Sequence, residues 1–401
     1  MSTPVFIKKT LIATLSLTLT TVPVSTFAQV SKVPVLTGEM PVIPETDPFV
    51  MPDDYPQALV EHFEANMDAR SYVVIDSQTN RVLAERQGNT RYPIASMSKV
   101  AAMYLIYQAL EEGTIKLDQE IEVPQIIEDT MSFNFDMSAM GLYADTKYTV
   151  EELMYGIMLL SGNDATSTLM WHLYGDEQTA VKAIRDLLTS WGISNFEFYT
   201  TSGIPNQYLP ESMWIDGSNA TSENQMTAAD VAYMAQKTIT DFPQILEISS
   251  ANSFIAREGT DREIIMYNPN LLLPGAEYGR EGITGLKSGT TDAAGKNFVA
   301  TGQENGRPIV AVAMGVFDRE DLTLSPFWEI EILLDKLAEF PDLYNNSNLP
   351  TNIPQAPLEE ETTEETMQET LAPEVQEQLP TENRRDNPIT NFMKGIFDIF
   401  K

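Results

Sequence analysis

Strand-like and helix-like hydrophobic patterns follow one another along this chain in an order that permits few folds. Two strand-like runs at 72–76 and 81–85 flank a turn at 77–80, and three more runs follow at 283–287, 297–302 and 308–317. The intervening sequence has apolar residues at helical spacing over 100–111, 150–173, 177–188 and 227–239, and a proline-started helix closes the pattern over 326–340. Strands at both ends of a helical middle predict an α+β fold, with one antiparallel β-sheet flanked by helices and a helical subdomain.

The first 54 residues are predicted to lie outside that fold. Lys8 and Lys9 precede a short apolar run at 11–19, and Thr-Phe-Ala at 26–28 forms a cleavage site before Gln29. The apolar run is too short to span a bilayer, so we expect residues 1–28 to be a signal peptide that directs export and is removed. An uncleaved anchor is the alternative. Residues 29–54 are Pro-rich and patternless, as in a linker, and 55–340 form the expected domain.

The composition changes after residue 340. Residues 341–387 are rich in Glu, Pro, Thr and Gln, which predicts an acidic disordered tether. Residues 388–401 differ again, because their apolar side chains recur at helical spacing. That stripe predicts an amphipathic helix in the membrane surface, on the extracytoplasmic face after export. Docking of the same helix onto the domain or a partner is the alternative.

Composition also excludes several kinds of chemistry. The formal net charge of −33 repels nucleic acid, so no nucleic-acid partner is expected. No cysteine is present, which removes disulfides, thiolate metal sites and cysteine nucleophiles. The two histidines, His62 and His172, lie in no catalytic motif. A hydrolase built on this sequence therefore needs a base other than histidine.

A first candidate motif, Ser-Met-Ser-Lys at 96–99, opens the helical run at 100–111. Ser96 and Lys99 are three residues apart and share one helix face. A serine hydroxyl needs a base, and Lys99 can serve only when its amine is neutral, which requires burial or a neighbouring cation. An ordinary serine cap beside a solvated lysine explains the same four residues when they stand alone.

Two further short motifs follow along the chain. Ser161 and Asn163 lie two positions apart on a turn between apolar helical segments, so both can reach one cavity. The third motif is Lys-Ser-Gly-Thr at the end of the strand-like run at 283–287. In a strand, Lys287 and Gly289 point to one face and Ser288 to the other.

The third motif is suited to holding an extended peptide. Gly289 permits close approach to the backbone, so a substrate can pair with the strand edge. Lys287 supplies a cation and Thr290 a hydroxyl, which suit a substrate carboxylate. A helix-breaking loop and an edge strand protected by lysine are the structural alternatives for the second and third motifs.

The three motifs in this order are the signature of serine penicillin-recognising enzymes. Together with the Thr-Asp-Ala-Ala-Gly extension at 291–295, they resemble the D-alanyl-D-alanine carboxypeptidases among the low-molecular-mass penicillin-binding proteins. The resemblance covers about 55–320 and implies the penicillin-binding transpeptidase or β-lactamase-like fold. It also implies release of the terminal D-alanine from peptidoglycan stem peptides, inhibition by β-lactams, and no metal or cofactor.

The resemblance also implies the catalytic roles. Ser96 attacks the carbonyl between the two D-alanines and forms an acyl-enzyme, and Lys99 takes the hydroxyl proton. Ser161 relays a proton to the leaving D-alanine, and Lys287 adjusts both groups. A β-lactam acylates Ser96 in the same way and is released slowly.

The substrate-binding roles follow from the same resemblance. Asn163 orients the substrate amide, and Ser288 and Thr290 hold the terminal carboxylate on the strand that carries Gly289. The N–H groups of Ser96 and Thr290 form an oxyanion hole. This sequence departs from the family in having Ser288 where threonine is usual, and an acidic tether where many relatives have a second β-rich domain.

Other functions remain open on these residues. A transpeptidase or endopeptidase would use the same groups with a different acceptor or substrate. A class A β-lactamase adds a glutamate that activates water, and Glu197, Glu211 and Glu223 are the candidates between the second and third motifs. The non-enzymatic alternative is an inactive wall-binding scaffold, against which the intact set of catalytic residues argues.

Overall fold

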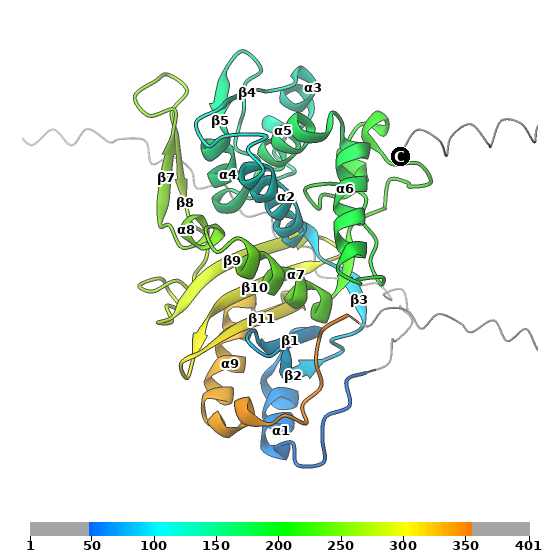
Figure 1. Ribbon diagram of the computed structural model, residues 1–401, viewed down its shortest axis with the longest axis vertical. Helices are drawn as coiled ribbons and strands as arrows, with labels where there is room; N and C mark the ends of the chain where they lie inside the picture. The colour runs from blue at the N-terminus through cyan, green and yellow to red at the C-terminus, as the bar shows by residue number, and fades with distance from the viewer. Residues whose placement is uncertain (1–47, 355–401) are drawn as a thin grey trace, which may run out of the picture. The chain divides into compact units, whose positions relative to one another are not determined.

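The computed structural model describes residues 48–354, which contain a five-stranded antiparallel sheet. The strand order is β2-β1-β11-β10-β9, so strands from the two ends of the domain lie side by side (Figure 1). The strands are β1 (Ser71–Asp76), β2 (Arg81–Arg86), β9 (Ile283–Thr291), β10 (Gly295–Glu304) and β11 (Arg307–Val316). The predicted class is confirmed: the fold is α+β with one main antiparallel sheet.

Each face of this sheet packs against its own hydrophobic core because successive side chains alternate between faces. On β1, Val73 and Ile75 belong to the core of the helical region. Tyr72 and Val74 belong to the opposite core, which includes side chains of α1 (Gln57–Asn66) and α9 (Pro326–Ala338). The sheet therefore separates α1 and α9 from the helices that lie between β2 and β9 in the sequence, as Figure 1 shows.

The helical region lies between β2 and β9 in the sequence. Its longer helices are α2 (Lys99–Glu111), α4 (Val150–Leu159), α5 (Asn163–Tyr174), α6 (Glu177–Ser190) and α7 (Ala228–Asp241). Short helices are η1 (Ala95–Ser98), α3 (Gln125–Ile127), η2 (Glu128–Ser132), η3 (Asn206–Tyr208), η4 (Glu211–Met213) and α8 (Ile245–Ser249). Three two-stranded sheets complete it: β3 (Arg91–Pro93) with β6 (Gln225–Thr227), β4 (Glu120–Glu122) with β5 (Lys147–Thr149), and β7 (Ser253–Ala256) with β8 (Ile264–Tyr267).

The structure corrects three of the expected boundaries. The helical run at 150–173 is two helices, because the backbone turns between α4 and α5 at Ser161, where φ is 55°. The strand expected at 283–287 continues to Thr291, so the third motif lies inside β9 rather than at its end. Residues 341–354, which were expected to belong to the tether, are packed instead, since η5 (Pro341–Asn345) follows α9 and Leu343, Tyr344 and Leu349 are buried.

The packed chain after α9 runs back to the sheet. Arg81 of β2 forms an isolated antiparallel bridge with Thr351, and Val82 N donates to Pro350 O at 2.9 Å. Residues 349–352 thus cover the β2 edge. The predicted signal peptide, most of the linker, residues 355–387 of the predicted tether and the predicted terminal helix at 388–401 lie outside the described residues.

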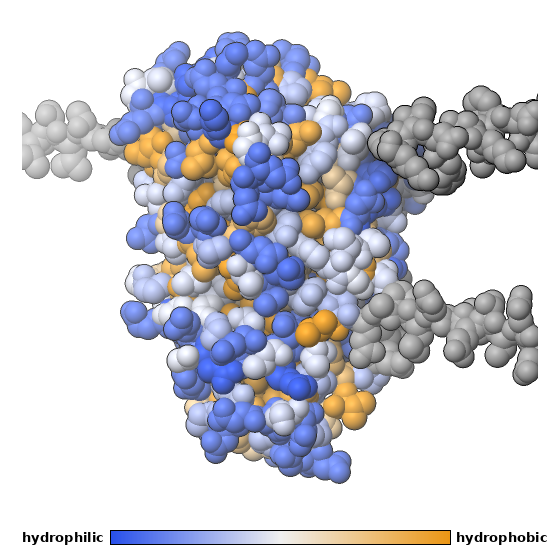
Figure 2. All heavy atoms as spheres, viewed as in Figure 1, coloured by the Kyte–Doolittle hydropathy of each residue, from blue (hydrophilic) through white to orange (hydrophobic). Residues whose placement is uncertain are grey.

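The face of the molecule in Figure 2 is predominantly hydrophilic, with apolar surface in scattered patches. Within residues 48–354, no helix is both long enough and apolar enough to cross a bilayer.

Candidate active site

The first motif lies where η1 passes into α2. Ser96 belongs to η1 and Lys99 is the first residue of α2, so one helical turn brings the two side chains together. Ala95 has a positive φ of 48°, which turns the chain sharply just before Ser96. Ser96 is half-buried, whereas the Lys99 side chain is completely enclosed. The hydroxyl can therefore meet a substrate and the amine cannot meet bulk water.

The Lys99 amine has three hydrogen-bond partners from three segments. Nζ lies 2.8 Å from Ser96 Oγ, 2.8 Å from Asn163 Oδ1 and 2.7 Å from the Ser202 carbonyl oxygen. The amide and the carbonyl oxygens can only accept hydrogen bonds, so they hold the two hydrogens of a neutral amine. Its lone pair is then directed at the remaining partner, the Ser96 hydroxyl. This arrangement suits Lys99 to remove the serine proton.

The second motif contributes groups from both sides of the turn between α4 and α5. Asn163 is the first residue of α5, and Ser161 lies in the left-handed region of backbone conformation. A methyl group on Gly162 would lie 3.0 Å from Asp164 Oδ1 and 3.2 Å from Gly156 O, so this turn is tightly closed. The Lys287 amine donates to Ser161 Oγ at 3.0 Å and joins the second motif to the third.

The third motif lies on β9, which is an edge strand of the main sheet. Gly289 faces the start of η1: a methyl group there would lie 2.7 Å from Ile94 O and 2.9 Å from Ser96 N. Lys287 is buried, Ser288 is half-buried and Thr290 is exposed. The strand therefore comes close to Ser96 and leaves its own hydroxyl groups accessible.

Burial lowers the pKa of both lysines, and the charge of Lys287 also affects Lys99. Burial lowers the pKa of Lys99 well below its ordinary value, and the neighbouring Lys287 lowers this pKa further. The buried Asp164 and Glu177 carboxylates oppose this effect on the Lys99 pKa. Burial alone lowers the pKa of Lys287 to about 7. A neutral Lys99 near neutral pH is what a base for Ser96 requires.

The structure thus brings all eight sequence-predicted site residues to three adjoining segments. Side-chain hydrogen bonds join Lys99 to Ser96 and Asn163 in one group. A second group consists of Lys287 and Ser161. Ser288, Gly289 and Thr290 follow Lys287 on β9, whose Gly289 lies against η1.

Sequence reasoning missed the turn at 200–204, which supplies the Ser202 carbonyl. Gly203 has a φ of +83°, and a methyl group on it would lie 1.9 Å from Ala95 O. Asn224 joins this turn to the first motif: its Nδ2 donates to Ser98 Oγ at 2.9 Å and to Thr200 O at 2.8 Å. The Ser-Gly pair is the only local signal, and it indicates a turn without indicating its target.

A second missed residue, Asp164, fixes the segment that covers the second motif. Its carboxylate accepts the backbone N–H groups of Met140, Gly141 and Leu142 at 2.7, 2.9 and 3.2 Å, and that of Ala165 at 2.8 Å. Asn163 N also donates to Ser138 O at 3.0 Å. Residues 138–142 are therefore held directly against the start of α5.

The three glutamates considered for a β-lactamase are engaged elsewhere. Glu197 pairs with Arg91 at 2.6 Å, and Glu211 is exposed in η4. Glu223 is buried and accepts the Thr291 hydroxyl at 2.9 Å. None of the hydrogen bonds found in residues 48–354 joins these carboxylates to Ser96, Lys99 or Ser161.

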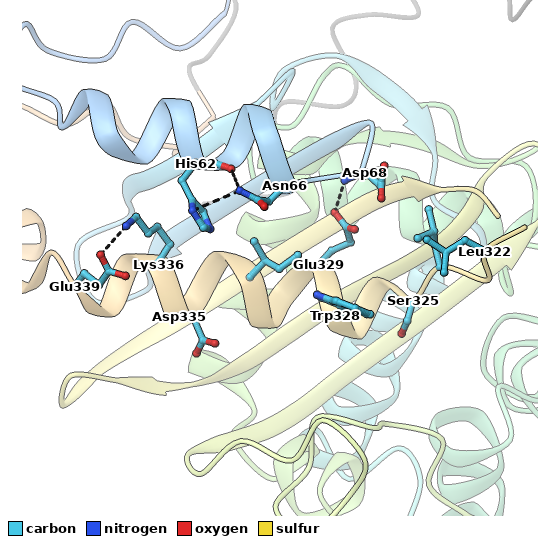
Figure 3. A pocket seen from close by; sticks show the side chains of 12 residues that line it. His62, Asn66, Asp68, Leu322, Ser325, Trp328, Glu329, Asp335, Lys336 and Glu339 are labelled. Atoms are coloured by element: carbon cyan, nitrogen blue, oxygen red, sulfur yellow. Dashed lines mark hydrogen bonds and ion pairs between the residues drawn. The ribbon is translucent and has the colours of Figure 1, made fainter. Parts of the chain in front are cut away.

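A separate pocket of about 390 Å³ lies between α1 and α9 (Figure 3). Charged side chains that line it form hydrogen bonds or ion pairs with their neighbours. Glu329 accepts hydrogen bonds from Asp68 N and Ala69 N, both at 2.9 Å, and Lys336 forms an ion pair with Glu339. The pocket lies across the sheet from the lysine–serine cluster and contains none of the motif residues. In the described part of the chain, no group of three acidic or histidine side chains is placed to hold a metal ion.

Comparison with known proteins identifies the relatives of this arrangement. The model of the family described as D-alanyl-D-alanine carboxypeptidase matches residues 58–318. The D-alanyl-D-alanine carboxypeptidase DacA of Haemophilus influenzae is 29% identical over 252 residues. That match covers 62% of this chain and 57% of the relative, so the chain spans less than two thirds of its length.

Solved structures agree with the sequence comparison. A peptidoglycan synthesis regulatory factor, PBP3 of Streptococcus pneumoniae, is 29% identical with a TM-score of 0.64, over 68% of this chain and 72% of that one. Penicillin-binding protein 5 of Haemophilus influenzae is 25% identical with a TM-score of 0.54, over 69% and 71%. The expected penicillin-binding fold is confirmed by these likenesses.

Proposed function

The chain belongs to the D-alanyl-D-alanine carboxypeptidase family, and from that membership we propose that it removes the terminal D-alanine from peptidoglycan stem peptides through an acyl-enzyme on Ser96. The observation that carries this proposal is the 2.8 Å contact between Lys99 Nζ and Ser96 Oγ, because it pairs a nucleophile with a buried base. Both partners lie beside an edge strand that can receive an extended peptide.

Acylation begins when Lys99 takes the proton of the Ser96 hydroxyl. The Ser96 oxygen forms a bond to the carbonyl carbon between the two D-alanines, and the resulting oxyanion is held by the N–H groups of Ser96 and Thr290. The carbon–nitrogen bond then breaks, and the proton taken by Lys99 passes through the Ser161 hydroxyl to the leaving amine, which leaves Lys99 neutral again. The 3.0 Å bond from Lys287 supports this relay, because it keeps the Ser161 oxygen at a fixed place.

Deacylation adds water across the ester. Lys99 accepts a proton from the water, whose oxygen attacks the ester carbon, and the Ser96 oxygen leaves with a proton returned by Lys99.

Asn163 orients the substrate amide, while Ser288 and Thr290 bind the terminal carboxylate near the Lys287 cation. A β-lactam acylates Ser96 by the same first step and is released slowly.

The location of the enzyme follows from the sequence beyond the described residues. The predicted export signal at 1–28 and the apolar stripe at 388–401 support action at the extracytoplasmic face of a membrane, close to peptidoglycan. The residues between the fold and that stripe would act as a spacer from the bilayer.

Mass spectrometry of a diacetyl-Lys-D-Ala-D-Ala peptide tests this function. The parent chain should release one D-alanine, and a Ser96→Ala variant should release none. If the parent chain releases no D-alanine but penicillin labels its Ser96, the site uses another substrate or acceptor. If penicillin also fails to label Ser96, the scaffold alternative takes the place of the enzyme.

A further inference from the structure

Glu177 is buried beside the site, although it is the first residue of α6, where acidic side chains are usually solvated. Its capping neighbour Asp176 already accepts Thr179 N at 2.7 Å, so the helix start does not need the Glu177 carboxylate. A buried carboxylate is costly unless hydrogen bonds compensate it. Its partners therefore indicate what it does.

The Glu177 carboxylate joins two segments, α5 and the turn at 200–204. One oxygen accepts Trp171 Nε1 at 2.7 Å and is 3.4 Å from Ser167 Oγ, both on α5. The other accepts the Thr201 backbone N–H at 2.7 Å and its hydroxyl at 2.9 Å. Glu177 thus fastens α5 to the turn at 200–204.

These two segments supply the two fixed acceptors of the Lys99 amine. Asn163 Oδ1 comes from the first residue of α5, and the Ser202 carbonyl directly follows Thr201. If either acceptor moved, the amine would no longer be held with its lone pair toward Ser96. The geometry points to Glu177 as a positioning residue for the general base, an inference that rests on the proposed function of Lys99 and Ser96.

The charge of Glu177 adds a second, separable effect. The charged and titratable groups that influence Lys99 are Lys287 on β9, Asp164 on α5 and Glu177 on α6; Lys287 lowers the Lys99 pKa and the two carboxylates raise it. Removing one carboxylate therefore lowers the Lys99 pKa. Because a base acts when neutral, the pH at which acylation reaches half its maximal rate should fall as well.

The test measures the rate constant for labelling of Ser96 by a fluorescent penicillin, with the full chain, from about pH 5 to about pH 9. In the plot of rate against pH, the rising limb is the range in which the rate increases. Glu177→Gln should lower the maximal rate about tenfold, because it places an amide NH₂ against the N–H and O–H donors that now meet the carboxylate. It should also move the rising limb to lower pH, because it removes the charge. Glu177→Asp keeps the charge, so it should lower the maximal rate and leave the limb in place.

Glu329→Gln is the matched control. Glu329 is also a buried carboxylate on a helix that accepts two backbone N–H groups, but it lies across the sheet. This variant should leave both the maximal rate and the limb unchanged. The inference is overturned if Glu177→Gln, measured per folded molecule, behaves like this control.

If Glu177→Gln does not fold, Trp171→Phe decides the question, because it removes the shorter of the two α5 hydrogen bonds to Glu177 and keeps the carboxylate. It should lower the maximal rate about threefold with no shift of the limb, and an unchanged rate overturns the inference. Failure of the proposed acylation of Ser96 looks different: the parent chain itself would show no labelling of Ser96 at any pH.

Discussion

The Lys287 amine donates to Ser161 Oγ at 3.0 Å, and this bond connects the edge strand β9 to the turn between α4 and α5. The same amine donates to the Ser288 carbonyl at 3.0 Å, so its position along the strand is fixed. Because burial brings its pKa to about 7, this cation can lose its proton near neutral pH.

The first prediction concerns that proton. A protonated Lys287 attracts the substrate carboxylate, so KM for the peptide should rise as pH increases above about 7, where the amine becomes neutral. Peptide kinetics across pH measure this. Lys287→Arg stays charged and should remove the pH dependence of KM, even if its KM is higher overall. A parent KM that is constant across this range would contradict the role of the cation.

Lys99→Ala should reduce the rate of Ser96 acylation by about 10²–10⁴-fold, the usual contribution of a general base. The measurement is the second-order rate constant with a fluorescent penicillin, normalised to folded protein. Lys182→Ala is a suitable control because Lys182 is exposed and pairs with Asp186 on the same helix. Equal rates in the parent and Lys99→Ala would require a different base.

Gly203→Ala should damage both stability and acylation. Its φ of +83° costs an alanine about 1 kcal/mol, and the added methyl group would lie 1.9 Å from the Ala95 carbonyl oxygen, beside the nucleophile. Gly217 has almost the same φ, +81°, but nothing within 4 Å of the methyl position. Gly217→Ala therefore measures the backbone cost alone. Thermal unfolding and labelling of both variants should show a much larger loss for Gly203→Ala.

Asp164→Asn should destabilise the domain by about 2–4 kcal/mol, because an amide NH₂ would face backbone N–H donors that now meet a carboxylate. Denaturant unfolding measures this change. The segment at 138–142 should lose protection from hydrogen exchange before the rest of the domain does. Uniform loss of protection would show that Asp164 does not hold this segment specifically.

Removing residues 388–401 should release the chain from anionic lipid vesicles without changing its acylation rate. The apolar stripe of that segment predicts interfacial binding, and the folded domain carries the whole catalytic cluster. Vesicle co-sedimentation measures the binding. A shortened chain that still sediments would place the lipid contact elsewhere.

The three candidate motifs could be found in the sequence because each is local. Ser96 and Lys99 meet through one helical turn, and the Lys-Ser-Gly-Thr run lies on a single strand. Ser202 could not be found in this way, since it acts through a backbone carbonyl that every residue has. Glu177 was equally hidden, because an acidic residue in the first turn of a helix is usually explained by the helix itself.

The helices and strands of the fold were predictable from the sequence, but the order of the strands in the sheet was not. Alternating and helical periodicities gave the sheet and its helices, because burial of one face leaves a regular pattern in the sequence. The order of the strands was not available, since the pairing of β1 with β11 joins residues far apart in the chain. The boundary at residue 340 was set too early because residues 341–354 pack through a few scattered apolar side chains, which composition averages out.

The strip formed by residues 349–352 also affects how this protein behaves at high concentration. β2 is one of the two outer strands of the main sheet, and the bridge from Arg81 to Thr351 occupies its edge. An unoccupied edge can pair with a strand of another molecule. A fragment ended at residue 340 would keep every catalytic group yet self-associate through β2, whereas one ended at residue 354 would carry its own protection against aggregation.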